Sequence, residues 1–206
     1  MVRKSAVAIL LVCCASSLGG CMGALYNQEA QVHYESGRSH EAAQDFVGAR
    51  QQYCGAMARG ERANEPKSTM AMLTYDCGRT SEYVCDFPDA EKYLLKSLEL
   101  QEQVGDPDGT ALVPRIMELA RLYSDQGNYA ESAKYFAMGL PMLDKLGAEQ
   151  HDPLAYADAL DEYGDMLAHL GRDADASAQR AKALSIRANN PNAKKGFVPA
   201  RCKATR

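Results

Sequence analysis

The sequence lacks the motifs that mark common catalytic and metal sites. It contains no HExxH motif, no serine in a nucleophile elbow and no glycine-rich phosphate loop. Among Cys54, Cys77, Cys85 and Cys202, no two are spaced as CxxC, and no histidine stands within three residues of any of them. We therefore expect a protein that is not an enzyme and that uses no metal or other cofactor.

The sequence is also poor in positive charge and in long apolar runs. It holds 23 lysine and arginine residues against 27 aspartate and glutamate residues, and its formal net charge is −4. An acidic chain is poorly suited to general electrostatic binding of nucleic acid. After the first twenty residues, no apolar run approaches the roughly 18 residues that a membrane span requires. We expect neither a nucleic-acid partner nor a transmembrane helix.

The first twenty residues carry the pattern of an export signal. Arg3 and Lys4 precede an apolar stretch over residues 6–15 that is too short to span a bilayer, and small residues follow it. The tetrad Leu18-Gly19-Gly20-Cys21 resembles the lipobox of bacterial lipoproteins, in which the cysteine is acylated. The resemblance implies a signal peptide over 1–20, a lipidated N-terminus over 21–24 and an anchor of two or three acyl chains on Cys21, such as palmitate.

Met22 rather than aspartate follows the expected anchor. In a bacterium with two membranes, this resembles the pattern of lipoproteins sorted to the outer membrane. We expect a lipid-anchored protein of the cell envelope that faces the periplasm.

A repeated pattern of large and small residues sets the expected fold. Its clearest copy runs from Ile116 to Leu140 and resembles a tetratricopeptide repeat (TPR). In that family, the small positions lie where the two helices of a hairpin approach most closely, because larger side chains would force the helices apart. This copy has Gly127 at the turn, and its small positions hold Ala120, Ser132 and Gly139.

The same template recurs on both sides of this copy. Upstream, Cys85 replaces the turn glycine, and the small positions hold Gly78, Ala90 and Ser97. Downstream, Gly171 is at the turn, and the small positions hold Gly164, Ala176 and Ala183. A first, weaker copy places Gly37 at the turn, with Ala30, Ala42 and Ala49 at the small positions.

Equivalent small residues of successive copies are then 48, 42 and 44 residues apart, whereas the ordinary repeat is about 34 residues long. The extra residues extend the second helix of each hairpin, which resembles the long repeats of kinesin light chains. The sequence thus predicts an all-α fold, a right-handed α-solenoid of about four TPR-like hairpins over 25–188. Residues 189–206 contain no acidic residue and predict a basic, irregular C-terminal tail.

A candidate partner-binding groove follows from the resemblance, because the first helix of each hairpin lines the concave surface of TPR proteins. Its centre is rich in tyrosine, methionine and arginine, which are enriched at interface hot spots, and one end is acidic. An exposed amphipathic face is the alternative interpretation. The candidate groove residues are Tyr75, Arg79, Tyr83, Met117, Arg121, Asp125, Asp161 and Asp165.

The four cysteines beyond Cys21 allow three disulfide pairings, and the sequence alone does not choose among them. Cys54 lies near the end of one expected helix and Cys77 lies within the next, which stacks beside it. A disulfide between Cys54 and Cys77 is therefore sterically possible, and it would join two adjacent repeats.

The favoured interpretation is a membrane-anchored scaffold that binds a peptide or protein partner in its groove and serves the assembly of an envelope complex. Pilotins of pilus systems, which are lipoproteins with the same type of repeat, illustrate such a role. The alternative is a lipoprotein that binds peptidoglycan or another anionic glycan, or assists an enzyme, through its basic tail.

Overall fold

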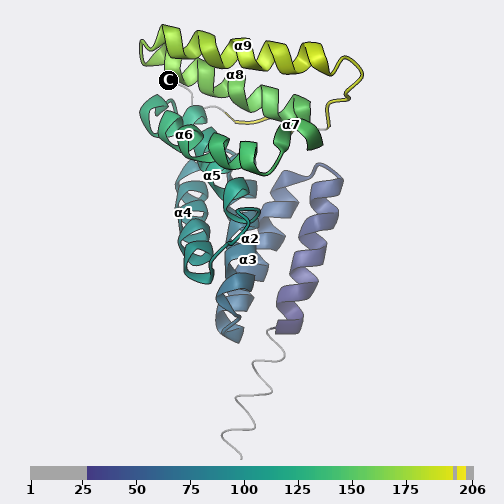
Figure 1. Ribbon diagram of the computed structural model, residues 1–206. Helices are drawn as coiled ribbons and strands as arrows, with labels where there is room; N and C mark the ends of the chain where they lie inside the picture. The colour runs from purple at the N-terminus through teal and green to yellow at the C-terminus, as the bar shows by residue number, and fades with distance from the viewer. Residues whose placement is uncertain (1–26, 197–198, 203–206) are drawn as a thin grey trace, which may run out of the picture.

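The computed structural model describes residues 27–196 and 199–202, and its helices stack as hairpins into an all-α solenoid (Figure 1). The expected signal peptide, Cys21 and residues 22–24 lie outside the described residues. The described residues contain no strand, and the predicted fold class is confirmed. A helix that includes residues 27–42 is followed by α2 (Phe46–Ala63), α3 (Lys67–Tyr83), α4 (Phe87–Val104), α5 (Leu112–Asp125), α6 (Tyr129–Lys145), the short α7 (Ala148–His151), α8 (Pro153–His169) and α9 (Asp173–Asn189).

The hairpin turns pass through a residue with positive φ, directly before a helix cap. The φ angle is 74° at Gly127 and 71° at Gly171, a conformation that glycine adopts without steric cost. Cys85 takes the equivalent place before α4, with a φ of 64°. The side chain of Asn128 then accepts a hydrogen bond from the backbone N–H of Glu131, which satisfies one of the open donors at the start of α6.

Small residues lie where helices cross. A Cβ atom on Gly78 would stand 2.9 Å from both the side chain and the backbone nitrogen of Leu94, so α3 and α4 could not stay as close. A Cβ on Gly139 would meet the side chain of Met117. The other small residues of the last three predicted repeats are also buried, namely Ala90, Ser97, Ala120, Ser132, Gly164, Ala176 and Ala183.

The first hairpin is displaced by seven residues from its predicted alignment. Its turn contains Gln44, with a φ of 61°, whereas Gly37 lies inside the helix and faces the ring of Tyr53. Ala42 is exposed, and Ala56 is buried in a position that the prediction did not assign. The alignment was wrong because it took the glycine as the turn. The spacing to the next repeat becomes 41 residues, close to the 42 and 44 of the later repeats.

Apolar side chains form two separate clusters. The larger cluster spans α4 to α9 and includes Leu119, Phe136 and Leu160, each at most 1% exposed. The smaller cluster lies between α2 and α3 and consists of Ala56, Met57, Leu73 and Cys77. The larger cluster fixes α5 and α8 relative to each other, and these two helices carry much of the candidate groove.

The chain after α9 turns back along α8 instead of continuing away from the solenoid (Figure 1). Lys195 forms an ion pair with Asp158 of α8. Arg201 reaches carboxylates on α3 and α5, and a disulfide joins Cys202 to Cys85 in the turn before α4. The described part of the tail has no helix after α9, and it forms part of the wall of the groove.

Candidate functional site

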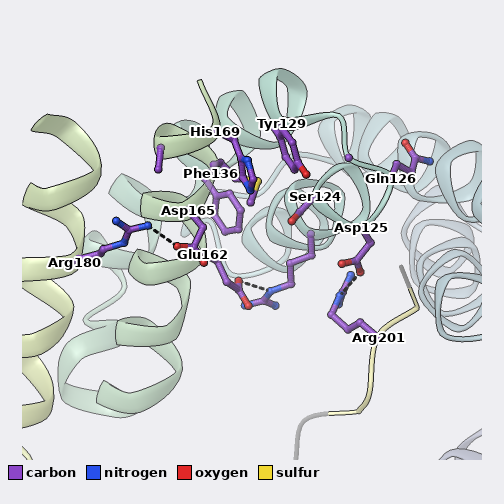
Figure 2. Close-up of a pocket in the computed structure, with 14 residues that line it drawn as sticks. Ser124, Asp125, Gln126, Tyr129, Phe136, Glu162, Asp165, His169, Arg180 and Arg201 are labelled. Atoms are coloured by element: carbon purple, nitrogen blue, oxygen red, sulfur yellow. Dashed lines mark hydrogen bonds and ion pairs between the residues drawn. The ribbon is translucent and has the colours of Figure 1, made fainter. Parts of the chain in front are cut away.

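A cleft of about 900 Å³ lies between α5, α8 and the tail (Figure 2). Arg121 and Asp125 line it from α5, Glu162 and Asp165 from α8, and Arg201 from the tail. A second cleft of about 450 Å³ shares Arg121, Glu162 and Arg201 and extends to Tyr83 and Lys195. The two clefts meet at the guanidinium groups of Arg121 and Arg201.

Three carboxylates surround the Arg201 guanidinium, and we call Glu82, Glu118 and Asp125 the acidic pocket. The Arg201 Nε donates to Asp125 Oδ2 at 2.8 Å, and Nη1 lies 3.2 Å from Glu118 Oε1. Its Nη2 contacts Glu82 Oε1. The side chains of Glu82, Glu118 and Asp125 are 0%, 6% and 7% exposed, and that of Arg201 is 17% exposed. All three guanidinium nitrogens therefore meet a buried carboxylate.

The buried charges of the acidic pocket depend on one another. Burial lowers the pKa of Arg201 to about 10, which still leaves the guanidinium protonated at neutral pH. Burial also raises the pKa of Glu118, while the positive charges of Arg121 and Arg79 act in the opposite direction. Removing one partner from such a group leaves an uncompensated buried charge, which is strongly destabilising. The acidic pocket consequently requires a cation.

The α8 wall of the larger cleft is lined by ion pairs and stacked rings (Figure 2). Arg121 Nε donates to Glu162 Oε2 at 2.9 Å. Burial would lower the pKa of Arg121, but the carboxylates of Glu162 and Glu118 outweigh it and raise that pKa. At the rim, the rings of Tyr129 and His169 are stacked with their centroids 3.9 Å apart. The wall offers both charges and a flat aromatic surface.

Cations from α9 and the tail neutralise the predicted acidic end. Arg187 donates to Asp161 at 2.6 Å and to Asp158 at 2.7 Å, and Arg180 donates to Asp165 at 2.7 Å. Burial would raise the pKa of Asp158, but hydrogen bonds from Lys195 and Arg187 outweigh it and lower that pKa. These aspartates thus line the groove with most of their charge compensated by the same chain.

The structure brings the three predicted central residues of α3 together. The Arg79 guanidinium carbon lies 5.8 Å from the ring centroid of Tyr75 and 5.7 Å from that of Tyr83, within the range of cation–π attraction. Arg79 also forms ion pairs with Glu41 and Asp76. It is therefore engaged within the chain.

Met117 was assigned to the groove from its repeat position, but the structure places it in the core. It is 5% exposed and packs near Gly139 of α6. The prediction from the repeat position was wrong for Met117 because α5 is buried on most of its circumference. Little of the surface of α5 therefore remains to line the groove.

The sequence reasoning also missed Glu118 of the acidic pocket and the cation that fills this pocket, Arg201. Glu118 was overlooked because it did not fall on a repeat position that lines the groove, although a glutamate within the apolar run 116–120 is unusual. Arg201 was assigned only to a basic tail, because its partners on α3 and α5 are 76 to 119 residues away in the chain. No local pattern reveals such pairs.

Two disulfides are present among the described residues. Cys54 of α2 is joined to Cys77 of α3, and Cys85 is joined to Cys202. The first connects adjacent repeats within the smaller cluster. The second attaches the tail to the α3–α4 turn beside the groove.

The described residues hold neither a metal-binding group nor a membrane-spanning helix. No group of three or more histidine, cysteine, aspartate or glutamate side chains there is arranged to hold a metal ion. No helix in the same part of the chain combines the length and the apolar character of a membrane span.

Comparison with known proteins shows the fold. No protein-family model and no curated protein matches this sequence. Among solved structures, BtubC (BKLC) from P. vanneervenii has a TM-score of 0.71 at 15% identity, covering 86% of this chain and 70% of its own. A putative kinesin light chain from Podosopora anserina with nearly identical TPR-like repeats has a TM-score of 0.66 at 14% identity, covering 77% of this chain and 74% of its own.

A Rap protein complexed with Competence and Sporulation Factor has a TM-score of 0.62 at 16% identity. The match covers 79% of this chain and 44% of the Rap chain. These likenesses make the fold a TPR-like helical repeat. The resemblance to kinesin light chain repeats, first suggested by the length of each repeat, is found again in three dimensions.

Proposed function

We propose that this chain is a lipid-anchored, periplasm-facing scaffold that binds a peptide or protein segment in its concave groove and helps to assemble an envelope complex. The observation that carries the proposal is the position of the chain's own tail. An irregular segment runs along α8 and inserts Arg201 among buried carboxylates. A groove that accepts one irregular segment has the width and the polar partners to accept another.

The proposed role involves binding and no catalysis. The groove offers ion pairs, aromatic rings and two open clefts, which suit the recognition of a polar segment. The Rap protein, which resembles this chain in fold, was solved as a complex with Competence and Sporulation Factor. That complex supports the proposal by analogy of fold only.

Membrane attachment rests on the lipobox-like tetrad that ends in Cys21. The substitution Cys21→Ala should abolish acylation, because no other residue supplies the thioether to the diacylglycerol. We expect labelled palmitate to be incorporated by the wild type and not by this variant, and the variant to leave the membrane fraction after a high-salt wash. A variant that stays with the membranes under these conditions would exclude a lipid anchor at Cys21.

The groove is favoured over the basic tail as the binding surface because two cations of the tail are already engaged. Lys195 and Arg201 form ion pairs with α8, α5 and α3. A glycan-binding tail would need to release these contacts first.

Photo-crosslinking in cells of the host tests the proposal. A crosslinking residue at Ser124, which lines the larger cleft, should capture a discrete protein partner. The same residue at Met138, which is 45% exposed on α6, is the matched control and should not. Glycan adducts formed only at Lys194 would support the tail instead, and protein capture at Met138 alone would contradict the groove.

A further inference from the structure

We propose that the acidic pocket is a recognition site for an arginine side chain of the partner, that Arg201 fills it as an internal stand-in, and that the Cys85–Cys202 disulfide controls access to it. This inference rests on the proposed function and names the chemistry by which the groove would recognise its partner. It is carried by the geometry around Arg201, by an incompletely bonded carboxylate and by the position of the disulfide.

The geometry selects a guanidinium. Asp125, Glu118 and Glu82 approach three different nitrogens of Arg201. A guanidinium presents five N–H donors in a rigid plane and can meet all three carboxylates at once. A lysine ammonium is a single point charge on a flexible chain and cannot reproduce this arrangement. The site is therefore expected to distinguish arginine from lysine, as well as from neutral side chains.

Glu82 shows that Arg201 does not fully satisfy the pocket. Its side chain is completely buried, and Oε2 has no hydrogen-bond partner among the described residues, whereas Oε1 and the Arg201 Nη2 contact each other without good hydrogen-bond geometry. Buried polar groups are normally hydrogen-bonded, so this carboxylate retains unused bonding capacity. The 450 Å³ cleft next to it is bordered by Glu118, Pro199 and Arg201 and gives a second segment a place to lie.

An empty pocket is unfavourable because three buried carboxylates would lose the one cation that contacts all of them. Entry of a partner therefore amounts to an exchange of one guanidinium for another. The free energy of the pocket changes little in this exchange. The local concentration of Arg201 therefore determines whether an arginine of the partner can replace it. A group held on a short tether competes at an effective concentration of about millimolar, and a second attachment point raises its occupancy further.

The Cys85–Cys202 disulfide is that second attachment point. Cys202 follows Arg201 directly, so the disulfide fixes the backbone beside the pocket. Cys85 is exposed, whereas Cys77 of the other disulfide is 0% exposed. A reductant of the dithiol class can therefore reach Cys85–Cys202 more readily.

The reductive step is a thiol–disulfide exchange. One thiolate of the dithiol attacks a sulfur of the Cys85–Cys202 bond, the S–S bond breaks, and a mixed disulfide forms. The second thiol of the reductant then displaces the protein sulfur. Two electrons and two protons pass to Cys85 and Cys202, and the dithiol leaves as its own disulfide. The tail then stays attached only through the chain that follows α9.

Binding of a synthetic peptide to the purified full chain tests the arginine site. The peptide has the sequence of residues 196–206 with Cys202→Ser and carries a fluorescent label for anisotropy. The protein variant Cys85→Ser/Cys202→Ser keeps Arg201 and the Cys54–Cys77 bond, so its core contacts are retained. We expect this variant to bind the peptide at least about tenfold more tightly than the oxidised wild type.

Peptide and pocket variants separate arginine recognition from general charge attraction. Peptides with Arg201→Lys or Arg201→Gln should bind the double-serine variant at least about tenfold more weakly. Glu118→Gln in that variant should weaken the arginine peptide to a similar extent. Glu102→Gln is the matched control, because it also removes one carboxylate charge but stands at an exposed position of α4 that lines neither cleft, and it should change affinity by less than about threefold.

Equal affinities for the arginine, lysine and glutamine peptides would overturn the arginine site, as would equal effects of Glu118→Gln and Glu102→Gln. Equal binding by wild type and the double-serine variant would overturn control by the disulfide. Alkylation and mass mapping during titration with dithiothreitol provide an independent check, since Cys85 and Cys202 should react before Cys54 and Cys77. These outcomes are distinct from failure of the proposed function, which the absence of crosslinking at Ser124 would show.

Discussion

The helices before α4 and those from α4 onward differ in how they are held together. The smaller cluster between α2 and α3 contains four buried residues and is joined by the Cys54–Cys77 disulfide. The larger cluster contains twenty buried residues and spans α4 to α9. The first region also uses ion pairs between helices, such as those of Arg79 with Glu41 and of Arg50 with Asp86. A contact between hairpins that buries little apolar surface can thus be strengthened by covalent and polar links.

The difference follows from the nature of repeat proteins. Each hairpin contacts mainly its neighbours, so local stability depends on local interactions rather than on one common core. The groove reflects the same contrast. Its α3 wall is tied to the preceding hairpin by Arg79, whereas its α5 and α8 walls stand on the larger cluster.

The largest effect is expected for Phe136→Ala in the larger cluster. Phe136 is fully buried, so the substitution leaves a cavity and should lower the free energy of unfolding by roughly 3–5 kcal/mol. Phe46→Ala is the matched control, because Phe46 is only half-buried, against Tyr83. It should cost less than about 2 kcal/mol. Chemical denaturation measures both, and equal losses would remove the distinction between the two regions.

Loss of the Cys54–Cys77 disulfide should affect mainly the first region. The bond closes a loop of 23 residues, for which the chain-entropy model gives about 3 kcal/mol. In Cys54→Ala/Cys77→Ala, amide hydrogen exchange should accelerate in α2 and α3. In the matched variant Cys85→Ser/Cys202→Ser, these two helices should exchange as in the wild type. Acceleration spread evenly over α2 to α9 would argue against local stabilisation.

Overpacking tests the helix crossings in both regions. Ala120→Leu and Ala56→Leu enlarge fully buried residues and should each destabilise the protein by roughly 1–3 kcal/mol. Ala130→Leu and Ala42→Leu are the controls at exposed positions and should stay within about 0.5 kcal/mol. Thermal melts compare the four variants. A larger effect at Ala42 than at Ala56 would favour the alignment in which Gly37 marks the turn.

The smallest effect is expected for Asp158→Asn at the acidic end. The folded-state pKa of Asp158 is lowered, so its contribution to stability is complete above the unfolded-state pKa of about 3.9 and is lost as the pH falls through the folded-state value. The variant should therefore be less stable than the wild type by under about 1 kcal/mol at neutral pH. The two should converge in acid.

Denaturation curves measured from neutral to acidic pH give this comparison. Glu102→Gln, at an exposed position of α4, is the control and should follow the wild-type profile. A constant difference between Asp158→Asn and the wild type at all pH values would mean that lost packing, rather than lost charge pairing, explains the effect.

The sequence by itself determined the helical class, the long repeat and the positions of the later hairpins. It could do so because the constraint is local: a glycine at the turn, as at Gly127, and a small residue at a fixed interval, as at Ala120, recur at each helix crossing. The first hairpin was not predicted correctly because its turn contains Gln44 instead of a glycine, whereas Gly37 lies where its helix packs against Tyr53.

Only the tertiary structure decided what occupies the groove. Repeat positions predicted that Tyr75, Tyr83 and Arg121 face the concave side. They did not predict that Arg79 forms an ion pair with Glu41, or that Met117 is buried. The contact of Arg201 with α3 and α5 depends on how far the solenoid curves and on where α9 ends. Curvature accumulates from small rotations at every helix crossing, and no local pattern in the sequence encodes their sum.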